Sequence, residues 1–365
     1  MPADELERRR LAHRRLRGLH LRGQPAASPA QVVGRLGAMQ AQEYAYARWS
    51  IAQRSLGLDL GAVEAALVAG EVLRTHVLRP TWHFLAAADI RWVLALSAPR
   101  VQRASAHSYR VLDLDARTLA AGADTIAADL AGGHHRTRAE LRAVLEAAGI
   151  PAAGLRLAFI LMNAELEALI CSGAMRGRQQ TYALLAERAP GARERDPDEA
   201  LGELTRRYFT TRGPATAKDF SRWASLPLGQ VRRGLEMIAA EVEGAEVGGR
   251  EYWSGAGSAA RPLPSPRVDL VQCYDEYVMS YTESRDVLAA PGRPLPVTDR
   301  DTYYHAILLD GSMVGRWRHA LRGDGVTVEA MLYRRLIAGE RQALDAEVAR
   351  YGAFHGLAAS LTIKP

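Results

Sequence analysis

The order of elements between residues 201 and 256 restricts the fold more than any other stretch of this chain. Thr216 and Asp219 have the spacing of a reciprocal helix cap, and Gly248-Gly249 divides the last part of the stretch into a hairpin. The predicted helices and hairpin occupy residues 201–211, 216 to a turn at 225–227, 228–240 and 242–253. Helix, capped helix, turn, basic helix and hairpin is the order typical of a winged-helix module.

Two similar units precede this one in the sequence. Ser28-Pro29 opens a helix in the first unit, and Thr137 and Glu140 have the capping-box spacing in the second. Each unit ends in two ribbon-like segments, at 72–78 and 81–85 in the first and at 171–178 and 181–185 in the second. The sequence therefore predicts three tandem winged-helix modules, over residues 1–110, 111–195 and 196–256.

The composition changes after a linker at 255–267 that is rich in Gly, Ser, Pro and Ala. Asp310-Gly311 beyond it is a favourable pair for a two-residue hairpin turn. The expected strands are 268–273, 303–309, 313–318 and 325–333, and a final helix is expected at 341–350. The predicted fold class is mainly α with small β-ribbons, with three winged-helix modules followed by a C-terminal mixed β domain at 265–365.

Arginine supplies almost all of the positive charge, because Lys218 and Lys364 are the only lysines and the net charge is +6. Arginine binds phosphate in a bidentate manner, but +6 over 365 residues supports a polyanionic partner only weakly. The arginine-rich helix predicted at 5–21 has either a solvated face or a face turned toward phosphates.

Cysteine usage and hydropathy argue against several classes of protein. Cys171 and Cys273 lie far apart without CxxC or Cys/His spacing, which predicts a reducing cytosol and no zinc site. The charged N-terminus lacks the apolar core of a signal peptide, and the apolar run 155–170 contains charged residues. We therefore expect a cytoplasmic monomer with no metal, no cofactor and no membrane partner.

Gln40-Ala41-Gln42 is the main candidate for a functional site in this sequence. A glutamine amide is not a useful base, but it can hold a water or present a dipole to a developing charge. The two amides converge only if the backbone is extended, kinked or at a helix end, because residues two apart do not face each other on a helix. Ordinary surface polarity is the alternative interpretation.

Two other pairs of residues could carry chemistry. His76 and His83 lie on predicted strands without a third ligand, which favours a packed or hydrogen-bonded role over a metal site. Asp275 and Glu276 could form a carboxylate pair, but adjacent residues on a strand point to opposite faces. A structural role is therefore favoured for both pairs.

Four segments carry a resemblance to a known family: Gln40-Ala41-Gln42, residues 74–83, Tyr274-Asp275-Glu276-Tyr277, and Leu309-Asp310-Gly311 continuing to Gly315-Arg316-Trp317. Together they resemble the winged-helix DNA glycosylases related to AlkZ and YcaQ, over most of the chain. The resemblance implies three winged-helix modules and a C-terminal β domain around a channel for DNA. Pro80 departs from the Arg-Gly-Thr of relatives and should stiffen the turn.

The family's Gln-aliphatic-Gln signature maps onto Gln40 and Gln42, which the resemblance implies are catalytic. It implies hydrolysis of the N-glycosidic bond of N7-alkylated guanine in double-stranded DNA. The unhooking of interstrand crosslinks, in DNA repair or genotoxin self-resistance, is an extension of that activity. The alkylated base is already a cationic leaving group, so a placed water and a dipole are needed more than a general acid. No lysine lies near the motif in sequence to form a Schiff base, so we expect a monofunctional enzyme.

Basic and aromatic residues in several segments are candidates for contact with DNA. They are Arg79, His83, Lys218, Arg222, Arg232, Arg316, Trp317 and Arg318. The strand with Arg316 to Arg318 could equally be a solvated edge, and the residues around 218–233 contact phosphates only if that face lines the channel.

Two non-enzymatic alternatives remain. Winged helices are most often transcription regulators, so three of them could bind DNA without catalysing a reaction. A scaffold whose modules bind other proteins is the second alternative. Release of free base from alkylated DNA separates the enzyme from both.

Overall fold

The computed structural model describes residues 3–257, 263–290, 293, 295 and 305–364. Contacts within the chain define two compact units, Met1–Val63 with Gly202–Pro365, and Glu64–Leu201. Residues 258–262 of the expected linker and 303–304 of an expected strand lie outside the described residues. The finer division into three modules and a β domain stays a prediction.

The larger unit begins with α1 (Ala3–Gly18), α2 (Pro29–Leu36), β1 (Met39–Gln40) and α3 (Tyr44–Ala52). Ser28 caps α2 as predicted, because its hydroxyl accepts the Gln31 N–H at 3.2 Å, and Pro29 is the first helical residue. α2 ends at Gly37, whose φ of 75° is available to glycine without steric cost.

Residues 201–256 fold into the expected order of elements. They contribute to α10 (Pro197–Arg212), α11 (Ala217–Ala224), α12 (Leu228–Met237), and the antiparallel strands β7 (Val242–Val247) and β8 (Arg250–Gly255). The reciprocal cap is confirmed, since Thr216 and Asp219 each accept the other's backbone N–H at 3.1 Å. Gly248 and Gly249 turn the hairpin with positive φ angles of 58° and 72°. These elements agree with a winged-helix module, and that assignment stays a prediction.

The C-terminal part of the larger unit contains a five-stranded sheet in the order β13-β12-β11-β10-β9. The strands are β9 (Val268–Val271), β10 (His305–Leu309), β11 (Ser312–Arg322), β12 (Gly325–Leu332) and β13 (Ala358–Lys364). Neighbours are antiparallel except β12 and β13, which run parallel. Asp310 and Gly311 have φ angles of 50° and 87°, which confirms the predicted hairpin turn.

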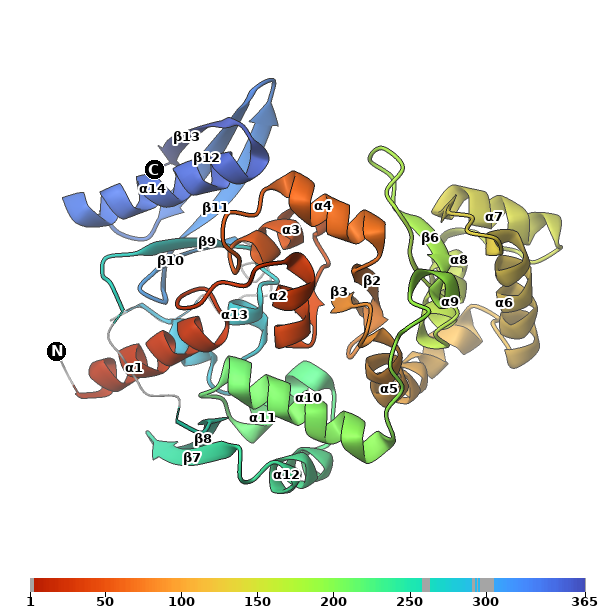
Figure 1. Ribbon diagram of the computed structural model, residues 1–365, viewed down its shortest axis with the longest axis horizontal. Helices are drawn as coiled ribbons and strands as arrows, with labels where there is room; N and C mark the ends of the chain where they lie inside the picture. The colour runs from red at the N-terminus through yellow and green to blue at the C-terminus, as the bar shows by residue number, and fades with distance from the viewer. Residues whose placement is uncertain (1–2, 258–262, 291–292, 294, 296–304, 365) are drawn as a thin grey trace. The chain divides into compact units, whose positions relative to one another are not determined.

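Helix α14 (Ala338–His355) runs along this sheet (Figure 1) and is longer than the predicted helix at 341–350. Its buried residues Leu344, Val348 and Tyr351 are spaced four and three apart, so they form one apolar face. The sequence analysis expected no element after this helix, whereas the structure adds β13. Two short helices, α13 (Glu276–Met279) and η1 (Arg285–Leu288), follow β9.

The smaller unit is mainly helical, and α4 (Leu60–Ala69) and α10 cross its boundaries. Its other elements are β2 (Val72–Val77), β3 (Thr81–Ala86), α5 (Ile90–Val111), α6 (Ala116–Leu130), β4 (Arg136–Thr137), α7 (Arg138–Ala147), α8 (Gly154–Leu166), β5 (Ile170–Ser172), β6 (Thr181–Leu184) and α9 (Leu185–Arg188). Strands β2 and β3 form the predicted antiparallel pair, and the second ribbon has the order β4-β6-β5.

The core of the smaller unit lies where α6, α7 and α8 pack together. Ile126 and Leu141 are fully buried in it, and Gly122 lets α6 approach Ile160 closely. The sequence signals did not predict α6. Of the helices in the described residues, none combines the length and apolar character needed to cross a bilayer.

Thr137→Ala tests the capping box that begins α7. The Thr137 hydroxyl accepts the Glu140 N–H at 3.3 Å, so its loss should lower the free energy of unfolding by about 1 kcal/mol in urea denaturation. Thr125→Ala is the control, because Thr125 lies within α6 and its hydroxyl only donates to the Ala121 carbonyl at 2.8 Å. Equal losses in the two variants would contradict a specific cap.

Candidate active site

Gln40 and Gln42 lie where an extended segment enters a helix. Gln40 ends β1, and α3 begins at Tyr44. This backbone meets the condition that the sequence set for the two amides to act together. Gln40 is buried, with 3% of its surface exposed, whereas Gln42 is exposed. The two amides therefore occupy different environments.

Both backbone polar groups of Gln40 are held by side chains from a distant segment. Its N–H donates to Oε1 of Glu276 at 2.8 Å. Its carbonyl accepts a hydrogen bond from Nε2 of Gln272 at 3.3 Å. The position of the motif is thus set by residues just after β9 and at the start of α13, and not by β1 alone.

Glu276 forms a buried ion pair with Arg212, the last residue of α10. Nη2 of Arg212 lies 2.7 Å from Oε2 of Glu276, and both side chains are at most 1% exposed. Arg212 also donates to the carbonyls of Leu36 at 2.8 Å and Ala38 at 2.9 Å. The same oxygen of Glu276 accepts the indole N–H of Trp223 at 2.9 Å. This single pair therefore fixes the chain on both sides of Gly37 and at Gln40.

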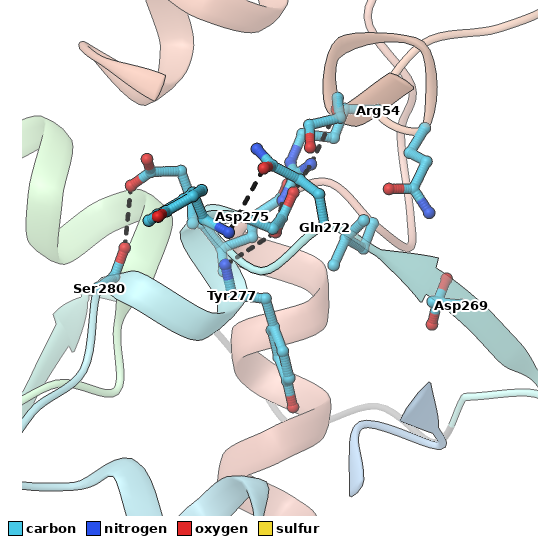
Figure 2. A network of polar contacts seen from close by, with 12 residues as sticks. Arg54, Asp269, Gln272, Asp275, Tyr277 and Ser280 are labelled. Atoms are coloured by element: carbon cyan, nitrogen blue, oxygen red, sulfur yellow. Dashed lines mark hydrogen bonds and ion pairs between the residues drawn. The ribbon is translucent and has the colours of Figure 1, made fainter. Parts of the chain in front are cut away.

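A second buried ion pair joins Asp275 to Arg54, with two nitrogen–oxygen distances of 2.7 and 2.9 Å. Arg54 also donates to the Leu19 and Ser50 carbonyls, each at 2.8 Å, so the pair connects the N-terminal segments to α13. Figure 2 shows Arg54 and Asp275 together with Gln272, and Tyr277 and Ser280 further along the chain. Asp275 caps α13 by accepting the Tyr277 N–H at 2.9 Å.

The expectation that Asp275 and Glu276 lie on a strand is wrong, because they begin α13. Each is buried and paired with an arginine, so the structural role favoured for them is confirmed. Two sequence markers of the resemblance, around Gln40 and around Glu276, therefore contact each other. The third marker, around Gly311, contacts the same region, because the Tyr277 hydroxyl donates to the Gly311 carbonyl at 2.8 Å.

The candidate DNA contacts on β11 have different environments. Arg318 is exposed over 70% of its side chain and pairs with Glu329 at 2.7 Å. Arg316 is half-buried and donates to the Tyr333 hydroxyl at 3.0 Å. Trp317 is only 2% exposed, and its indole N–H donates to the Val271 carbonyl at 3.0 Å. The Trp317 ring packs against Tyr46 and Tyr351, and its contact with DNA stays a prediction.

Lys218, Arg222 and Arg232 are exposed on α11 and α12. Lys218 and Arg232 line a groove of about 580 Å³ between α12 and the β7–β8 hairpin. Acidic residues line it too, and Lys218 pairs with Glu283 at 2.6 Å. The groove therefore has mixed charge, and Arg232 is the arginine of α11 and α12 that lines it.

Arg79 and His83 belong to the smaller unit. Arg79 is half-buried in the turn between β2 and β3, and His83 is buried with its Nδ1 2.9 Å from the Thr81 carbonyl. His76 on β2 lies 2.5 Å from the buried Glu165 carboxylate, which confirms the hydrogen-bonded role expected for it. Burial leaves His83 less suited to a DNA contact than Arg79.

A cluster of Glu43, Cys273 and His305 lies next to the motif and was not predicted from the sequence. Oε2 of Glu43 lies 3.4 Å from Nε2 of His305, and Oε1 lies 3.7 Å from the Cys273 sulfur. The Glu43 side chain is 37% exposed, and Glu43 follows Gln42 directly. That adjacency was the only sequence signal, because the other members come from the C-terminal sheet region.

Known proteins with similar sequences and structures include DNA glycosylases. The model of a family described as DNA glycosylase AlkZ-like matches residues 33–354. An interstrand DNA cross-link repair glycosylase of Streptomyces sahachiroi is 27% identical over 320 residues, which are 82% of this chain and 84% of that protein. The solved structure of Streptomyces sahachiroi DNA glycosylase AlkZ has a TM-score of 0.72 and 22% identity, over 98% of this chain and 99% of that one. The match to that solved structure establishes the fold alone.

Glu276→Gln tests whether the buried ion pair stabilises the larger unit. Loss of the charge leaves Arg212 buried without its counter-ion, so the free energy of unfolding should fall by about 3–5 kcal/mol. Glu146→Gln is the matched control, because Glu146 pairs with Arg142 at 3.0 Å on an exposed face of α7. We expect a change within about 1 kcal/mol for that variant. Equal effects in urea denaturation would contradict the anchoring role of Glu276.

Proposed function

Because the chain belongs to the AlkZ-like DNA glycosylase family, we propose that it hydrolyses the N-glycosidic bond of N7-alkylated guanine in DNA. The observation that carries this proposal is the support of Gln40 by Glu276 and Gln272, next to an exposed Gln42. A catalytic amide works only if its position is fixed before the substrate arrives. The buried network fixes the backbone of Gln40, which supports such preorganisation.

Hydrolysis of this substrate needs little help from acid catalysis. Alkylation at N7 gives the guanine a formal positive charge, so the base departs without a proton from a general acid. The bond breaks through an oxocarbenium-like sugar, which needs a water in place and a nearby negative dipole. Neutral amide oxygens meet both needs without binding the cationic base too tightly in the ground state.

The two amides take different roles in this proposal. Gln42 is exposed, so it orients the attacking water. Gln40 is buried, and its backbone is hydrogen bonded to two side chains, so it supports the position of Gln42 and directs its amide dipole toward the sugar. The burial difference is the reason for this division.

The positions of the two lysines support a monofunctional mechanism. Formation of a Schiff base with the abasic sugar needs a free amine. Lys218 pairs with Glu283, and Lys364 on β13 pairs with Glu329 at 3.1 Å. Water is therefore the proposed nucleophile, and the chain cleaves no sugar–phosphate bond through either lysine.

Double-stranded DNA is the proposed partner of a monomeric enzyme. The exposed arginines Arg222, Arg232 and Arg318 are the proposed phosphate contacts, with Arg79 from the smaller unit. The Streptomyces sahachiroi relative is described as a cross-link repair glycosylase, which supports interstrand crosslinks joined through N7 as a second substrate class. Both substrates share the same cationic leaving group.

Gln42→Ala should slow base release while DNA binding persists. Loss of one positioned amide is expected to lower the single-turnover rate on N7-methylguanine DNA on the order of 10²–10³-fold. Gln24→Ala is the control, since Gln24 is an exposed glutamine outside the motif. Sequence-specific binding of a palindrome without any base release by the wild type would favour a transcription regulator instead.

Arg232→Glu should weaken DNA binding through charge alone. A plot of the logarithm of the binding constant against the logarithm of salt concentration has a negative slope. We expect the magnitude of this slope to fall by about 1 or more in the variant. Arg117→Glu, at an exposed arginine on α6, supplies the same charge change outside the proposed contacts. Equal losses of affinity in both variants would place Arg232 outside the interface.

A further inference from the structure

We propose that Glu43 is the general base of the reaction, accepting the proton of the attacking water, and that Cys273 and His305 hold its carboxylate for this task. This inference rests on the proposed function. It adds a catalytic residue beyond the two glutamines, and it assigns a role to a cluster that the glutamine mechanism does not use.

The need for a base follows from the balance of the reaction. The C1′–N9 bond breaks with its electron pair on the purine, which neutralises the N7 charge, so the base leaves without taking a proton. The water oxygen forms the new bond to C1′ and must lose a proton. A glutamine amide cannot accept it as an effective base. A carboxylate close to Gln42 can.

Glu43 is the carboxylate in the right place. Asp275 and Glu276, which also lie beside the motif, are buried and paired with Arg54 and Arg212. Glu43 has no ion pair to Arg or Lys among the residues that the structure describes, and 37% of its side chain is exposed. Water can therefore reach Glu43, whereas the carboxylates of Asp275 and Glu276 are buried in ion pairs with arginines.

The Glu43 side chain is directed away from its own helix. Glu43 stands at the N-cap position of α3, and its side chain makes no capping hydrogen bond. It contacts the Cys273 thiol and the His305 imidazole instead, at 3.7 and 3.4 Å. Two residues outside α3 thus determine where the carboxylate lies.

The hydrogen bond that His305 accepts sets the tautomer of its ring, and Nε2 of that ring lies 3.4 Å from Glu43. Its Nδ1 accepts the Cys273 backbone N–H at 3.1 Å, so the proton of the neutral ring is on Nε2. Burial lowers the pKa of His305 to about 4, which keeps the ring neutral near pH 7. A protonated Nε2 has no lone pair for a metal ion, so the three residues suit a positioned carboxylate better than a metal centre.

The environment also adjusts the acidity of Glu43. Burial raises the pKa of Glu43 above its usual value, and the hydrogen bond from the Cys273 thiol partly opposes this. Burial also raises the pKa of Cys273, so the thiol keeps its proton and can donate. The titratable groups that face Glu43 in the described part of the chain are Cys273, His305 and Tyr46. A carboxylate with a raised pKa is a stronger base once ionised.

The test compares wild type, Glu43→Gln and Glu146→Gln in single-turnover release of N7-methylguanine from duplex DNA between pH 4.5 and 8. The wild-type rate should fall as pH decreases through the pKa of Glu43, because only the ionised form accepts a proton. Glu43→Gln should lower the rate at neutral pH on the order of 10²-fold and remove the acidic decline, with unchanged DNA affinity. Glu146→Gln should behave as wild type.

Cys273→Ala tests the positioning role separately. Loss of the thiol donor should raise the pKa of Glu43 and move the acidic decline of the rate to higher pH, a change that simple loss of packing would not cause. Added formate should restore part of the rate of Glu43→Ala, which keeps the test valid if the glutamine variant is unstable.

The outcomes distinguish this inference from the proposed function. If wild type releases base and Glu43→Gln matches it in rate and pH profile, the role of Glu43 is overturned and the glutamine mechanism stands. If wild type releases no base from alkylated or crosslinked DNA, both proposals are overturned.

Discussion

The buried ion pair between Arg212 and Glu276 is the interaction on which the site depends. Two charged groups out of water are stable only when their hydrogen-bonding capacity is met, and here the Leu36 and Ala38 carbonyls, the Gln40 N–H and the Trp223 indole meet it. These partners come from segments far apart in the sequence. The hydrogen bonds of these partners to the ion pair hold the start of the motif against α13. The stability of the fold and the geometry of the site therefore depend on the same contacts.

Features that depend on neighbouring residues could be predicted from the sequence. The Thr216–Asp219 cap and the Asp310-Gly311 turn form as expected, because each is satisfied by backbone groups a few residues away. The resemblance also identified the family correctly. The extended backbone before Gln42 met the condition stated for the two amides, although their burial differs in a way that no local pattern indicates.

Features that depend on distant partners could not be predicted. The sequence predicted a strand at 313–318, within β11. It did not indicate that Trp317 is buried while Arg318 faces solvent. Asp275 and Glu276 were expected on a strand. Their partners Arg54 and Arg212 lie far away in the sequence, so no local pattern indicates these ion pairs. Glu43 was overlooked for the same reason, since Cys273 and His305 approach it only in the folded sheet region.

The most direct test of the account is the single-turnover rate of base release by the double variant Gln40→Ala/Gln42→Ala on duplex DNA that contains N7-methylguanine. Release should fall to the spontaneous rate of the same DNA without enzyme, while the variant still folds and binds DNA. A rate equal to that of wild type would contradict the assignment of the catalytic centre to this segment.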